Sequence, residues 1–146
     1  MNPTFPMNQR QTTNAVAALD KLLTLLSRSF PQYLQHSRPY VPAGRDDVQL
    51  VFDDIVEDQT LLAERAIDQL SVLGAVPTGG EFPMEFTDTH DLSIDFLVEQ
   101  AIQYHQQDIQ TLRELSQALK LAPSAKAIVD EALGMAQGHL ESLQEC

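Results

Sequence analysis

The chain of 146 residues has few cationic side chains: nine Lys and Arg stand against 21 Asp and Glu, for a formal net charge of -12. Binding to nucleic acid or to anionic lipid depends on cations that neutralise phosphates, so we expect neither partner. The single cysteine, Cys146, cannot form a disulfide within the chain, which indicates a reducing compartment. No apolar run approaches the length of a membrane span, and the N-terminus lacks the basic start and apolar core of a secretory signal. The sequence therefore predicts a cytoplasmic protein.

The hydrophobic content is that of a globular protein. Apolar residues make up 43% of the chain and charged residues 21%, which is too apolar for a disordered polymer. The length predicts one domain. Nucleotide chemistry is not indicated, because the Gly79-Gly80 pair follows no strand and lacks the Lys-Ser/Thr ending of a phosphate-binding loop.

Four segments carry apolar residues at spacings of three and four, the period of an amphipathic helix, and no convincing strand is left. We expect an all-α domain over residues 12–146, preceded by a mobile tail over residues 1–11. The expected helices cover residues 13–36, 46–73, from Thr87 or Thr89 to 120, and 123–143.

Cap and breaker residues set the expected ends of these helices. Thr12 or Thr13 and then Asp46 are candidate N-caps, and Pro31 is expected to kink or end the first helix. Gly74 is expected to stop the second helix, and Pro123 suits the first turn of the last.

The long connection over residues 75–87 decides the expected topology. The helix before it is roughly 42 Å long at 1.5 Å per residue. A connection of about fourteen residues can extend to roughly 46–50 Å. The chain can therefore return along the whole bundle and make the second and third helices parallel, as in a ferritin-like four-helix bundle with one long crossover. The alternative is an up-down bundle with one large surface loop.

The second helix carries an acidic stripe. Asp53, Glu57, Glu64 and Asp68 recur close to the helical period, and Gln49 continues the stripe by one turn. Because Glu64 and Asp68 are one turn apart, both carboxylates can bind one hard cation. The ordinary alternative is a solvated face, with salt bridges to residues such as Arg65.

The histidines do not show an intrachain metal motif. His36, His90, His105 and His139 form neither His-x-x-x-His nor Glu-x-x-His, so an ordinary intrachain di-iron site is disfavoured. For His90 and His105 we expect solvent-facing or polar-packing roles.

Three motifs on the second helix resemble those of the Dps branch of the ferritin-like superfamily. That family has Leu-His-x-x-Phe-Glu, Asp-x-x-x-Glu and Leu-Gly-Gly-x-Pro in this order. The corresponding stretches here are residues 48–53 (Val-Gln-Leu-Val-Phe-Asp), 64–68 (Glu-Arg-Ala-Ile-Asp) and 73–77 (Leu-Gly-Ala-Val-Pro). Counting from Phe52 and back from Leu73 places the acidic pair in the same register, and the resemblance spans residues 14–143.

The resemblance implies an iron-storing mini-ferritin that oxidises Fe(II), consumes hydrogen peroxide and so protects against oxidative stress. Its ferroxidase site lies between two subunits, which here implies iron ligands at His36, Gln49, Glu64 and Asp68 in a homo-oligomer, a dimer at the least and a dodecamer if the cage is kept. Three departures stand out: Gln49 replaces a histidine, the two acids are exchanged, and His36 is one residue out of register. The tail has only Arg10, so the DNA binding of some family members is not implied.

Two alternatives remain open. The chain can be a ferritin-like bundle with a degenerate metal site that acts as a structural or interaction protein, with Gln49 as the mark of that loss. A weaker alternative is an intrachain site made by His105 or His139 with Glu99.

Overall fold

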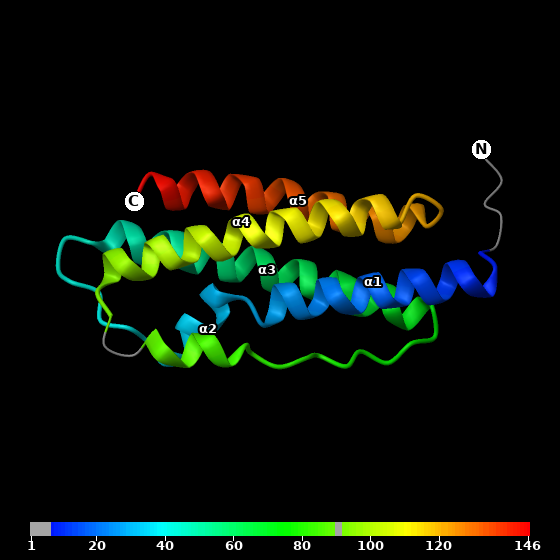
Figure 1. Ribbon diagram of the computed structural model, residues 1–146, viewed down its shortest axis with the longest axis horizontal. Helices are drawn as coiled ribbons and strands as arrows, with labels where there is room; N and C mark the ends of the chain where they lie inside the picture. The colour runs from blue at the N-terminus through cyan, green and yellow to red at the C-terminus, as the bar shows by residue number, and fades with distance from the viewer. Residues whose placement is uncertain (1–6, 90–91) are drawn as a thin grey trace.

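The computed structural model describes residues 7–89 and 92–146, and its regular structure there is entirely helical (Figure 1). The expected all-α class is confirmed. The elements in chain order are α1 (Gln9–Ser27), α2 (Phe30–Ser37), α3 (Asp46–Val72), the 3₁₀ helix η1 (Met84–Thr89), α4 (Ile94–Ala118) and α5 (Pro123–Gln144).

The four long helices lie side by side, and α3 and α4 run in the same direction (Figure 1). Residues 73–83, which we call the crossover segment, leave the end of α3 and return along the length of the molecule to η1. The main packing contacts join α1 to α3, α4 to α5, α3 to α5 and α1 to α4. Each of these pairs is antiparallel. The direction of α4 excludes the up-down alternative.

The crossover segment is docked on α1. The backbone N–H and hydroxyl of Thr78 both donate to the carboxylate of Asp20, at 3.1 and 2.6 Å. The Arg28 Nε donates to the carbonyl of Gly80 at 3.2 Å, and its guanidinium lies 5.1 Å from the centre of the Phe82 ring. The segment is therefore a fixed strap with specific contacts.

Two apolar clusters form the core, one toward each end of the bundle. The first joins all four long helices through buried side chains such as Leu22, Leu62, Leu112 and Val129. The second lies under α2 and η1 and contains Phe30, Phe52, Ile55, Phe86, Leu97 and Leu143. Burying each such side chain stabilises the fold by about 1.5–3 kcal/mol.

The start of α1 differs from the expectation. The helix begins at Gln9 with Asn8 as N-cap, because the Asn8 side chain accepts from the Gln11 N–H at 2.8 Å and the Gln11 side chain accepts from the Asn8 N–H at 3.0 Å. Thr12 and Thr13 are inside the helix. The prediction of a tail over residues 1–11 is thus wrong for residues 9–11, and its residues 1–6 lie outside the described residues.

The expected break at Pro31 occurs earlier in the chain, at Arg28 and Ser29. The first helix ends at Ser27, and Ser29 caps α2 by accepting from the Gln32 N–H at 3.3 Å. Pro31 then lies in the first turn of α2, where its missing N–H would have no helical partner in any case.

The start of α3 differs from the expectation by one residue, and its end agrees with it. Asp46 is the first helical residue of α3, and the N-cap position belongs to Arg45, whose side chain makes no capping bond. The prediction for Gly74 is confirmed: with a φ of 75° it follows α3, and the Ala75 N–H bonds the Leu70 carbonyl at 2.9 Å, which closes the helix end.

The last two helices also give one correction and one confirmation. Ser93 caps α4, whereas Thr87 and Thr89 belong to η1, so the predicted start was wrong. Pro123 is the first residue of α5, as expected. Among the described residues, no helix is both long and apolar enough to cross a bilayer.

Candidate functional site

The four residues implied as iron ligands are all exposed in the single chain. His36, near the end of α2, lies edge-on to Phe82 with 5.9 Å between the ring centres. Gln49, near the start of α3, donates from its amide Nε2 to Asp53 Oδ1 at 2.8 Å. Both Gln49 and Asp53 line a surface pocket of about 310 Å³ between α2 and α3.

Glu64 and Asp68 lie one turn apart on α3, with their side chains in solvent as the stripe predicts. Within the described residues, no three side chains of His, Cys, Asp or Glu come close enough together to hold a metal ion. The implied ligands therefore do not meet as a group of three in a single copy, and neither does Glu99 with both His105 and His139. Arg65 forms a surface ion pair with Glu131 of α5.

A layer of polar side chains separates the two apolar clusters at mid-bundle. Each long helix, or its continuation, contributes one member: Ser29 after α1, Gln59 from α3, His105 from α4 and His139 from α5. Ser29, Gln59 and His105 are buried, and the His139 side chain is 12% exposed. The clusters include the residues one turn before and after these positions, such as Ile55 and Leu62 around Gln59.

The contacts within this layer are specific. The Ser29 hydroxyl donates to Gln59 Oε1 at 2.7 Å, in a bond that joins the α1–α2 break to α3. His139 Nε2 lies 2.7 Å from Asp58 Oδ2, and the rings of His139 and His105 meet edge to face with 5.8 Å between their centres. The Nδ1 of His105 is buried without a hydrogen-bond partner among residues 7–89 and 92–146.

A small cavity of about 10 Å³, close to the volume of one water-sized probe, lies in this layer. His105, His139, Gln59 and Asp108 line it, with apolar walls from α1, α4 and α5. Burial, with a smaller contribution from the charge of His139, lowers the pKa of His105 to about 4. Burial raises the pKa of Asp108 to about 7. The two groups with the largest pKa shifts, His105 and Asp108, thus line this cavity and lie away from the acidic stripe.

Sequence reasoning missed this layer, and one signal could have found it. Gln59 and His105 occupy buried positions of the three-and-four pattern in α3 and α4, where a leucine or alanine would continue the apolar face. Of the two roles expected for His105, the solvent-facing one is wrong, because its side chain is buried in this layer, and His90 lies outside the described residues.

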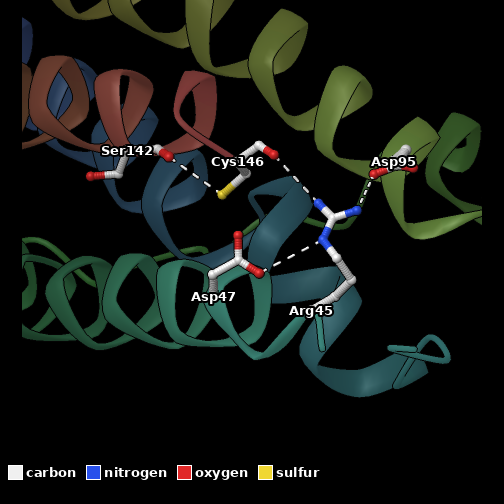
Figure 2. A network of polar contacts seen from close by, with 5 residues as sticks. All are labelled: Arg45, Asp47, Asp95, Ser142 and Cys146. Atoms are coloured by element: carbon white, nitrogen blue, oxygen red, sulfur yellow. Dashed lines mark hydrogen bonds and ion pairs between the residues drawn. The ribbon is translucent and has the colours of Figure 1, made fainter. Parts of the chain in front are cut away.

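At one end of the bundle, Arg45 links the start of α3 to α4 and to Cys146 (Figure 2). Its guanidinium pairs with Asp95 of α4, lies 3.7 Å from Asp47 and donates to the Cys146 carbonyl at 3.4 Å. The Cys146 thiol donates to the Ser142 carbonyl at 3.4 Å, and burial followed by the nearby Asp47 raises its pKa. A thiol held protonated in this way is a poor nucleophile.

Comparisons of the chain with protein-family models, with curated proteins and with solved structures find no significant match. The chain is an all-α protein with a long crossover between two parallel helices.

Proposed function

We propose that this chain is a ferritin-like four-helix bundle of the Dps type, and that it binds and oxidises Fe(II) between two copies. The observation that carries the proposal is the topology: α3 and α4 are parallel, and the crossover segment returns along the bundle between them. An up-down bundle needs only a short loop at this point, whereas ferritin-like folds need this long connection.

The positions of the acids support an inter-subunit site. Glu64 and Asp68 are exposed on α3, and His36 is exposed at the end of α2, so all three are available to a second copy. A two-fold dimer that pairs His36 of one copy with the acids of the other builds each site twice. The formal charge of -12 attracts cations toward the surface.

The chemistry of this site is a one-electron oxidation of each Fe(II). Two Fe(II) ions supply the two electrons that reduce hydrogen peroxide, and two protons complete the formation of water. The carboxylates of Glu64 and Asp68 would hold iron as a substrate, because a hard cation prefers oxygen ligands. Stored iron would be the product, and the chain would act as a ferroxidase.

The test replaces both acids at constant size. We expect Glu64→Gln with Asp68→Asn to reduce Fe(II) binding and peroxide-dependent oxidation by at least tenfold, with the helical spectrum unchanged. Asp54→Asn with Glu57→Gln is the matched control, since these exposed acids lie on the same helix. Native mass with bound metal, measured beside the oxidation rate, reports assembly and loading together.

Gln49 provides a second arm. Its amide is a poorer iron ligand than imidazole and is engaged with Asp53, so Gln49→His should increase both binding and oxidation rate. If the purified protein oxidises Fe(II) no faster than buffer, and Gln49→His changes nothing, the ferroxidase proposal fails.

A second candidate is a ferritin-like bundle with a degenerate metal site and a structural or interaction role. The bond between Gln49 and Asp53 favours it, because it satisfies the amide without a metal. This candidate expects an oligomer whose native mass is the same with and without a chelator, together with no ferroxidase activity.

A further inference from the structure

Four titratable side chains follow one another through the middle of the bundle. Asp58 of α3, 40% exposed, contacts His139 of α5, and His139 contacts the fully enclosed His105 of α4. Asp108, one turn after His105, lines the same cavity and also a surface groove of about 260 Å³ between α1 and α4. The iron site proposed above uses none of these residues.

His105 is held in a neutral state by its surroundings. Its side chain is 2% exposed, and its Nδ1 has no hydrogen-bond partner in the described part of the chain. A second ring proton would place a charge in the core beside another imidazole, with no carboxylate bonded to it. The pKa of His105, lowered to about 4 by burial and by His139, agrees with this geometry.

Asp108 is also favoured in its neutral form, but for a carboxyl group this is the protonated form. It is half-buried, and the cavity that it lines has Leu25, Leu26 and Leu112 as apolar walls. An ionised carboxylate loses part of its hydration there, so the neutral acid is favoured and burial raises the pKa of Asp108 to about 7. The charged and titratable groups of the surrounding elements are Asp58 on α3, His139 on α5, Lys21 and Arg28 on α1, Glu81 in the crossover segment, Glu85 in η1 and Tyr104 on α4.

We propose that Asp108 and His105 form a proton-compensating pair. In mildly acidic solution Asp108 is protonated and His105 is not, so both side chains are neutral and the centre of the bundle is uncharged. The pair is a device of the fold and is independent of iron.

The two residues act on folding with opposite signs. The Asp108 pKa rises from 3.8 to about 7, so between these values the folded chain binds one proton more than the unfolded chain, and folding is favoured as the pH falls. The His105 pKa falls from 6.5 to about 4, so between these values the unfolded chain binds one proton more, and folding is disfavoured as the pH falls. The two effects cancel where the windows overlap, which is from about pH 4 to pH 6.5.

The experiment separates the two effects by single and double substitution. Urea titrations at several values between about pH 4.5 and pH 6.5 give the folding constant of the wild type, Asp108→Asn, His105→Leu and the double variant. Relative to wild type, the folding constant of Asp108→Asn should fall about tenfold for each unit of decreasing pH. That of His105→Leu should rise by about the same factor, and the ratio for the double variant should be constant.

The exposed Asp54→Asn variant is the matched control for losing one carboxylate, and its ratio to wild type should be constant across this range. Ratios for Asp108→Asn and His105→Leu that do not change with pH, or that change with the same sign, would overturn the proposal.

A second measurement is an NMR titration of the wild-type protein, in which Asp108→Asn serves to assign the Asp108 signal. Carbon NMR of the aspartate carboxyl groups should show one group with a midpoint near pH 7, absent from Asp108→Asn, as its raised pKa requires. Nitrogen NMR should show one imidazole that stays neutral to below pH 5, as the lowered His105 pKa requires. The proposal is wrong if every aspartate titrates below pH 5 or every imidazole titrates near pH 6.5.

Discussion

Gly80→Ala tests whether the crossover segment is held against α1 as tightly as the structure indicates. Gly80 has a φ of 62°, and a Cβ added there would lie 2.6 Å from Thr24 Cγ2 and 2.7 Å from Thr24 Oγ1. Gly79 next to it has a φ of 78° but nothing within 4 Å of its added Cβ. Both glycines thus have a positive φ that would strain an alanine, and they differ in contact with α1.

The magnitudes follow from these two terms. A left-handed alanine costs about 1–2 kcal/mol, and the loss of freedom in the unfolded chain returns about 0.4–1 kcal/mol. Gly79→Ala should therefore lower the free energy of unfolding by about 1 kcal/mol. Gly80→Ala adds the overlap with Thr24, for which crowded sites give about 1–3 kcal/mol. Its total should be about 2–4 kcal/mol.

Urea unfolding followed by circular dichroism measures both variants, and Thr24→Ala supplies the second side of a double-mutant cycle. Combined with Thr24→Ala, Gly80→Ala should recover most of the difference from Gly79→Ala. Equal losses for the two glycine variants, or no recovery with Thr24→Ala, would refute a crossover packed directly on α1.

Three further predictions concern the layer, a cap and the end of the bundle. Ser29→Ala should lower the free energy of unfolding by about 2–4 kcal/mol, because it removes the cap of α2 and leaves Gln59 Oε1 buried without its donor. Urea titration measures this loss, and a value below about 0.5 kcal/mol would contradict the hydrogen bond between Ser29 and Gln59. Ser93→Ala should cost about 1 kcal/mol, seen as a lower Tm, because its side chain caps α4; an unchanged Tm would show the cap to be irrelevant. Arg45→Gln should lower the Tm only slightly, and by less at high salt, because its partner Asp95 is exposed; a large loss of Tm that does not depend on salt would show that packing dominates.

The helices and their order could be predicted because local patterns determine them. The three-and-four spacing located the four long helices, and Gly74 and Pro123 marked two ends, since these residues act through their own backbone geometry. The starts of α1 and α4 were wrong because several polar residues near each start can cap a helix. Asn8 is selected in α1 through its reciprocal bonds with Gln11, whereas the prediction placed the start at Thr12 or Thr13.

For the candidate sites too, local spacing could be predicted from the sequence and contacts between distant helices could not. Helical spacing alone places Glu64 and Asp68 on one exposed face of α3, and the structure has them there. It could not place His139 against Asp58, because these residues are 81 positions apart and meet only when α3 and α5 pack in one register. Nor does it give the surroundings of Asp108, whose apolar neighbours Leu25 and Leu26 come from α1.

The crossover segment also divides the chain into two modules. Residues before it form an antiparallel hairpin of α1 and α3, and residues after it form a second hairpin of α4 and α5. The two hairpins pack against each other through apolar faces, so a chain cut within the segment would give two fragments with matching apolar faces. Reassembly of these fragments would be bimolecular, and the stability of the bundle would then depend on protein concentration.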